Sequence, residues 1–284
     1  MSHSAKPMPA WRRRVAVRIA RVPAVATLAA LSMLGSLASP ARAQSDSVTR
    51  RPTELTLLVG VSQRRQHDVT ASPLVFGGSG FDGAATYARA LSRTFAFDAG
   101  IAGGTHRLGT AASAARENVI EAGAHVSVLR TVIGVDNAAR SLSVGLALAG
   151  GVISNQHAYA TPTETTANFL MASATLGPDV VWRERMRSGV ASVEVRTPIA
   201  GLVDHPYSEA KVDYTPVAIR TVSFNTLRAL DGSITFAPAS TRRAGLLVAY
   251  RFSLLRFADV QPFEAATQSL SIGFATRFGA RGPR

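Results

Sequence analysis

Side-chain character alternates with a period of two residues through most of the chain after Gln44, and this pattern constrains the fold more than any other. From Leu142 to Leu148 the even positions are Leu or Val, and the odd positions between them are Ser, Gly or Ala. From Ile120 to Val128 the even positions are again apolar, whereas the odd positions are Glu, Gly, His and Ser. Because successive side chains of a strand point to opposite faces of a sheet, each such segment predicts a β-strand with one apolar face.

The face opposite the apolar one is filled mainly by Gly, Ala and Ser, with an occasional charge. Small residues suit the crowded interior of a narrow barrel whose apolar face is turned to lipid. A sheet in hydrocarbon must also close, since an open edge leaves backbone groups unpaired at several kcal/mol each. We therefore predict an all-β fold, a single closed antiparallel transmembrane β-barrel. A soluble periplasmic β-protein shares the alternation and is the alternative.

The alternation and the turn residues predict about ten strands, with eight or twelve as alternatives. We place them near 54–65, 80–91, 94–105, 117–130, 140–153, 167–181, 188–200, 222–237, 243–256 and 266–278. Short connections then fall at 92–93, 183–187 and 239–242, and longer ones at 66–79, 106–116, 154–166, 201–221 and 257–265. Short periplasmic turns and longer outer loops are typical of outer-membrane barrels.

The segment from Ser271 to Phe278 carries a family resemblance. Its sequence, SIGFATRF, resembles the C-terminal strand signal of bacterial outer-membrane β-barrel proteins, in which a Gly precedes aromatic or apolar positions and the strand ends on Phe. Gly273, Phe274 and Phe278 fit that pattern, whereas Thr276 stands where an aromatic or apolar residue is expected. The resemblance implies recognition by the barrel-assembly machinery and names a superfamily, with no particular member.

The first 43 residues have the order of a secretory signal peptide: a basic start, an apolar run from Val22 to Leu37, and a small-x-small site at Ala41-Arg42-Ala43. We expect cleavage after Ala43, which gives a signal peptide over 1–43 and a barrel domain over 44–284; an uncleaved anchor is the alternative. Residues 1–43 hold seven of the 31 Lys and Arg and none of the 18 Asp and Glu. Residues 44–284 therefore carry 24 basic and 18 acidic side chains, a net charge of +6 instead of +13, which is poor evidence for nucleic-acid binding.

The chain has no cysteine, which excludes disulfides, a thiolate metal site and a Cys nucleophile. We expect no cofactor and no metal, and a monomer whose partners are outer-membrane lipid and the assembly machinery.

Seven charged or histidine side chains are predicted to face the lumen. Because isolated buried charge is costly, they must pair or be hydrated. We favour a salt-bridged plug over a charge-selective constriction, because the interior of so few strands is largely filled by side chains. The predicted lumen-facing polar cluster is Asp98, Glu121, His125, Glu194, Arg196, Arg251 and Arg277.

Four histidines, His67, His106, His157 and His205, each fall in or beside a different predicted outer loop. Imidazoles on one rim could bind metal or act as acid–base groups, but the spacing matches no ligand motif, and we interpret them as solvated loop residues. No catalytic motif is evident, so we predict a non-enzyme with a structural, adhesive or weakly pore-forming, porin-like role in the outer membrane. The alternative is an envelope enzyme with a site among the outer loops.

Overall fold

The computed structural model describes residues 53–69, 72–134, 139–158, 167–205, 219–239, 244–258 and 262–278. The predicted signal peptide lies outside these residues. No helix in the described part of the chain is long and apolar enough to span a membrane. Twelve strands make up the fold within the described residues: β1 (Thr53–Asp68), β2 (Phe76–Ala90), β3 (Phe95–Thr110), β4 (Ser113–Ile133), β5 (Arg140–Ala158), β6 (Ala167–Met186), β7 (Gly189–Arg196), β8 (Ala200–Asp204), β9 (Ile219–Ser223), β10 (Leu227–Pro238), β11 (Ala244–Phe257) and β12 (Phe263–Phe278).

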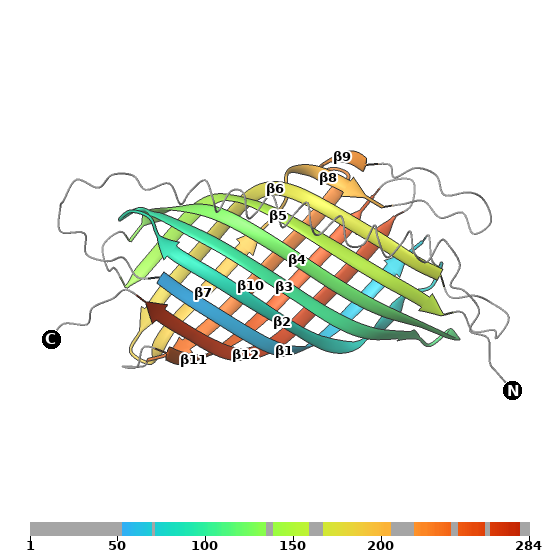
Figure 1. The fold of residues 1–284 in the computed structure, drawn as a ribbon, viewed down its shortest axis with the longest axis horizontal. Coiled ribbons are helices and arrows are strands. Elements are labelled where there is room, and N and C mark those ends of the chain that lie inside the picture. Colours follow the sequence, from blue (N-terminus) through green and yellow to red (C-terminus); the bar gives the residue numbers. More distant parts are fainter. Residues whose placement is uncertain are drawn as a thin grey trace, which may run out of the picture. The chain divides into compact units, whose positions relative to one another are not determined.

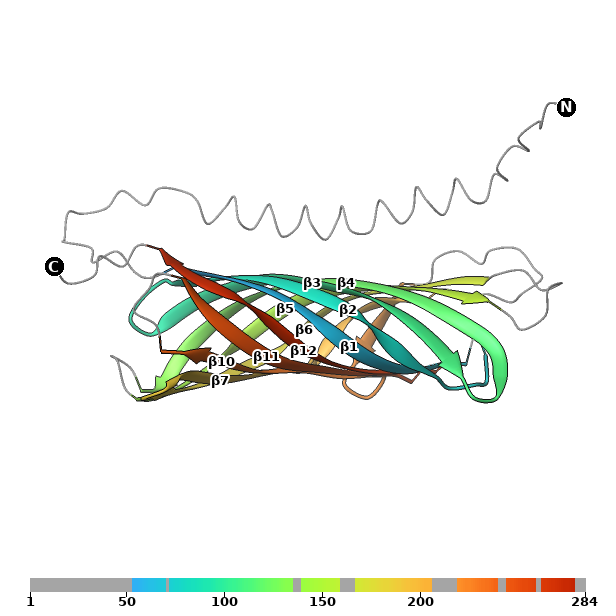
Figure 2. The ribbon, with the colours of Figure 1, turned by 90° about the horizontal axis from the view of Figure 1, so that it is seen from below.

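The sheet is antiparallel and closes on itself. Each strand from β1 to β7 pairs with its neighbour in the chain, β10 pairs with both β7 and β11, and β12 pairs with β1 over the full length of both strands. Ten tilted strands therefore form the barrel, as predicted, and Figures 1 and 2 show them wrapping around one axis. The remaining two, β8 and β9, form an extra pair against the first half of β6.

The two faces of the strands differ as the alternation predicts. On β1, Leu57, Val59 and Val61 point outward and are 50–66% exposed, whereas Leu58 and Ser62 point into the barrel and are buried. The same outward band of exposed apolar residues continues around the barrel. It includes Phe81, Ile101, Ile120, Leu146, Leu202, Ile234, Leu246, Leu270, Ile272 and Phe274. A continuous apolar wall of this kind is what a lipid-facing surface requires.

The strands reach further at the outer end than the sequence pattern indicated. The predicted loop over 106–116 is wrong: β3 continues to Thr110 and β4 begins at Ser113, which leaves a two-residue turn. The predicted loops over 66–79 and 154–166 are shortened in the same way, since β1 ends at Asp68 and β5 at Ala158. The outward side chains there become polar, as at Arg107, so the alternation of hydrophobicity stops while the ladder of backbone hydrogen bonds continues.

Apolar layers fill the lumen toward both ends. Two clusters lie on the outer side. One contains Met171, Val203, Val222, Leu227, Phe257 and Phe263, and the other contains Phe76, Leu108, Ala115 and Val119. A third cluster, Leu58, Leu247 and Ala249, lies toward the end where β1 begins and β12 ends. Polar side chains are interleaved with these clusters, since Glu117 lies between Ala115 and Val119 on β4 and His157 contacts the ring of Phe76.

Candidate functional site

An extended hydrogen-bonded chain crosses the outer half of the lumen from β1 to β5. Arg64 is almost fully buried and forms an ion pair with Glu121 of β4. Its Nε donates to Oε1 of Gln66 at 2.9 Å, and Nε2 of Gln66 donates to Oε2 of Glu117 at 2.8 Å. The other oxygen of Glu117 lies 3.0 Å from Nδ1 of His157. The chain therefore ties three strands together through hydrogen bonds between buried polar groups, although Nη2 of Arg64 has no hydrogen-bond partner among the described residues.

A second polar group, in the middle of the lumen, contains most of the predicted cluster. Nε2 of His125 lies 2.7 Å from Oδ1 of Asp98, and Nη2 of Arg196 lies 2.9 Å from Oε1 of Glu194. The buried Asp179 carboxylate lies 4.0 Å from Nε of Arg196. The topology thus brings together β3, β4, β6 and β7 at one depth. Each charged side chain of this group has an oppositely charged or imidazole neighbour.

The remaining predicted residues lie elsewhere. Arg251 of β11 forms an ion pair with Asp82 of β2, and Glu121 belongs to the outer chain. Arg277 is on the inward register but at the rim, where its exposed side chain lies 2.8 Å from Glu54. Sequence reasoning missed several partners. Arg64, Asp82 and Glu117 all lie in predicted strands and share the inward parity of those strands, so the alternation could have found them.

The Asp98, His125 and Glu194 side chains could approach one cation, since a ligand atom of each lies within 4.8 Å of the others. An imidazole and two carboxylates are donors that divalent transition metals accept. The guanidinium of Arg196 already contacts Glu194, however, and supplies positive charge at this point. The group nevertheless holds three carboxylates against one guanidinium and one imidazole, so its acidic side chains outnumber its basic ones.

The interpretation of the histidines as solvated loop residues is wrong for His106 and His157, which are 1% exposed and point into the barrel from β3 and β5. His205 follows β8 and lies between the rings of Phe257 and Phe263, with Nε2 3.9 Å from Oδ2 of Asp68. The error arose because the predicted strands were ended where the apolar pattern ended, whereas the strands of the structure continue beyond it.

A Ser–His pair that no sequence motif indicated is formed by Ser62 and His106, whose Oγ and Nε2 atoms lie 2.9 Å apart. The Nδ1 atom of His106 has no hydrogen-bond partner among the described residues, so no carboxylate orients the ring. Both residues are buried, at 3% and 1% exposure. A nucleophile needs an orienting group and access to substrate, and this pair has neither.

Comparison with known proteins addresses the fold alone. No protein-family model and no curated protein matches the chain. The outer membrane protease OmpT of Escherichia coli is similar in structure, with a TM-score of 0.50 and 8% identity over 84% of this chain and 99% of that one. The chain has the fold of a bacterial outer-membrane β-barrel. The translocator domain of autotransporter NalP from Neisseria meningitidis gives a TM-score of 0.46 at 9% identity, covering 89% of this chain and 98% of that one. OprG of Pseudomonas aeruginosa gives 0.32 at 10%, covering 81% and 97%.

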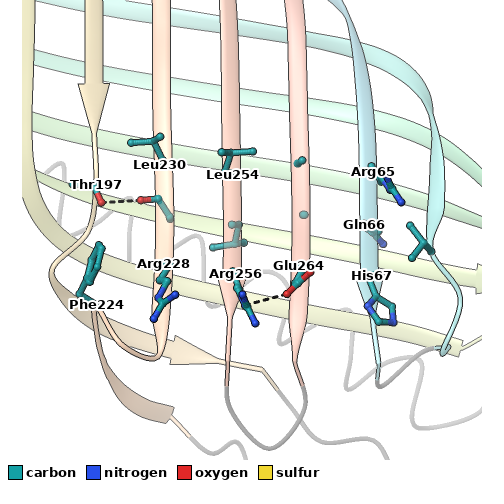
Figure 3. A pocket seen from close by; sticks show the side chains of 15 residues that line it. Arg65, Gln66, His67, Thr197, Phe224, Arg228, Leu230, Leu254, Arg256 and Glu264 are labelled. Atoms are coloured by element: carbon teal, nitrogen blue, oxygen red, sulfur yellow. Dashed lines mark hydrogen bonds and ion pairs between the residues drawn. The ribbon is translucent and has the colours of Figure 1, made fainter.

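The outer wall of this outer-membrane barrel fold carries a groove of about 600 Å³ over β10, β11, β12 and β1. Figure 3 shows its side chains: Arg65 lies in the same cross-strand row as Leu254 and Leu230, and Arg228 and Arg256 lie together in another row. Sequence reasoning did not predict this site. Its lining comes from the consecutive strands β10, β11 and β12 and from the distant β1, so no local motif marks it.

Proposed function

We propose that this protein is a non-catalytic, monomeric barrel of the bacterial outer membrane that acts through its outer surface and is closed to solutes. The observation that carries the proposal is the filling of the lumen, in which apolar clusters and polar groups that contact one another are interleaved among the described residues. A narrow barrel filled in this way offers no continuous aqueous path. The proposal favours a structural or adhesive role over a porin-like one.

The outer ends of the strands support the display of a surface beyond the lipid. Arg107, Arg116, Asn118 and Gln156 point outward from the outer ends of β3, β4 and β5 and are exposed. Polar side chains here suit a wall that stands in water above the apolar band. The family-like strand signal at Gly273, Phe274 and Phe278 supports delivery by the barrel-assembly machinery, and the apolar wall supports lipid as the immediate partner.

A proteolytic role, the activity in the name of OmpT, is not proposed for this chain. The Ser62–His106 pair is buried and lacks an orienting carboxylate within the described residues.

Planar-bilayer recording tests the closed lumen. We expect refolded, heat-modifiable protein to give no conductance steps above those of the bare bilayer. A sizeable, charge-selective conductance from the unmodified protein would show that the polar groups line a channel, and the proposal would fail. The outward variant Phe274→Ala serves as a control for nonspecific leakage, since Phe274 does not face the lumen.

A further inference from the structure

The polar group in the middle of the lumen carries more negative than positive charge. Asp98, Asp179 and Glu194 contribute three carboxylates, whereas Arg196 contributes one guanidinium and His125 one imidazole. The guanidinium is shared, since its Nη2 lies 2.9 Å from Oε1 of Glu194 and its Nε lies 4.0 Å from Oδ2 of Asp179. Because a carboxylate inside a protein is costly unless its charge is compensated, this group calls for further positive charge.

Asp179 shows the need for positive charge most directly. Its side chain is 0% exposed, and neither of its carboxylate oxygens has a hydrogen-bond partner among the described residues. The strand register places Asp179 of β6 opposite Arg196 of β7, and Asp231 of β10 lies opposite Arg196 on the other side. Two carboxylates therefore flank a guanidinium that already contacts Glu194, which points to a missing cation.

Three possible ligands of that cation converge from distant parts of the wall. Asp98 and His125 lie on the adjacent strands β3 and β4, and Glu194 lies on β7, which is separated from β4 by β5 and β6. One ligand atom of each side chain lies within 4.8 Å of the others. Two ligand atoms that are each about 2.1 Å from a tetrahedral zinc ion lie roughly 3.4 Å apart, so small side-chain rotations are sufficient.

The imidazole has a defined place, and there is space beside it. A Cβ at Gly100, which lies opposite His125 on β3, would collide with the imidazole ring, so the glycine leaves the space that the ring occupies. The ring is thereby held with Nε2 2.7 Å from Oδ1 of Asp98. The side chains of Asp98, His125 and Glu194 face the lumen and are still 14–26% exposed, so a space large enough for water adjoins all three.

We propose that Asp98, His125 and Glu194 bind one divalent transition-metal cation, such as zinc, which connects β3 and β4 with β7 across the lumen. Zinc accepts an imidazole together with carboxylates, whereas calcium and magnesium take oxygen ligands. Binding of the ion to Glu194 frees the guanidinium of Arg196 for Asp179, so one ion compensates both carboxylates. The site goes beyond the proposed function and does not depend on whether the lumen is closed.

Native mass spectrometry of the refolded mature chain, without a histidine tag, tests the proposal with zinc chloride added before folding. We expect one zinc ion per barrel and a higher midpoint of thermal unfolding than in the zinc-free barrel. Competition with a zinc-binding dye measures the affinity, which His125→Gln or Glu194→Gln should weaken about 100-fold or more, because loss of a residue that only supports a ligand already costs about 10–100-fold. The matched control is His67→Gln, which removes an outward imidazole of β1 and should leave zinc binding unchanged.

Each outcome supports or overturns the site. A folded, unmodified barrel that holds no stoichiometric zinc would overturn it, and so would an equal loss of affinity in His67→Gln and His125→Gln. Equal affinity for calcium would show that the imidazole is not a ligand. Migration on unheated gels shows which variants fold, and the visible absorption of cobalt bound to the unmodified chain reports imidazole and carboxylate ligands even if both glutamine variants fail to fold. A closed barrel without zinc contradicts this site only, whereas a conducting barrel that binds zinc contradicts only the proposed function.

Discussion

Removal of Arg251 should strand the carboxylate of Asp82 inside the barrel. The two side chains form an ion pair between β11 and β2 across the lumen, with side-chain exposures of 22% and 5%. Breaking a buried pair by removing one partner typically costs about 3–5 kcal/mol, because the other charge is left without compensation. Arg251 retains some access to water, so we place Arg251→Ala at the lower end, about 3 kcal/mol of unfolding free energy.

A double-variant cycle isolates the pair. Asp82→Ala/Arg251→Ala removes both charges, and we expect it to be less destabilised than the sum of the single changes by about 2 kcal/mol. The control is Arg140→Ala, which breaks the 2.9 Å ion pair to Glu184, where the side chains are 66% and 35% exposed. An exposed pair contributes at most about 1 kcal/mol to stability, so Arg140→Ala should hardly change the free energy of unfolding.

Urea unfolding in lipid vesicles, followed by loss of the compact band on unheated gels, measures each free energy. The reasoning is refuted if Arg251→Ala is no more destabilising than Arg140→Ala, or if the two lumen substitutions are additive. Either result would mean that Asp82 is hydrated without Arg251 and that water fills this part of the lumen.

Three further predictions concern the apolar outer face of the barrel, the pairing of β1 with β12, and cleavage of the chain after Ala43. Leu146→Arg on the outward face of β5 should make the free energy of insertion into vesicles less favourable by roughly 2–4 kcal/mol. Gln156→Arg, which is outward on the same strand but near its outer end, should insert normally. Equal insertion of the two variants would contradict the position of the apolar band. Gly273→Ala should slow folding into vesicles, because a Cβ at Gly273 collides with the backbone carbonyl oxygen of Leu57. Gly83→Ala is the control and should fold at the normal rate, because a Cβ at Gly83 stays 3.4 Å from the carbonyl oxygen of Leu58. Intact mass of envelope-purified protein should correspond to a chain that begins at Gln44, and a chain that still begins at Met1 would show that the site at Ala43 is not used.

The alternation was sufficient to predict the closed sheet, the ten barrel strands and the inward direction of Asp98, His125 and Glu194, because strand geometry fixes which face each residue occupies. It could not show which inward charges meet. Arg251 contacts Asp82, which is 169 residues away, and that meeting depends on the barrel diameter and on the strand register. The alternation also failed to predict the outer ends of the strands, for a related reason. His106 belongs to a ladder of backbone hydrogen bonds that continues after the outward side chains cease to be apolar.

The β1–β12 seam sets the order in which such a barrel can form. All sixteen residues of β1 pair with the sixteen of β12, from Thr53 opposite Phe278 to Asp68 opposite Phe263. These partners are nearly as far apart along the chain as the described residues allow, so their contacts carry the largest loop-closure entropy in the fold. Until β12 has emerged and docked, β1 presents a sixteen-residue row of unpaired donors and acceptors. The described strands can therefore close into a barrel only after β12 has paired with β1, and until then the free edge of β1 can pair with another chain.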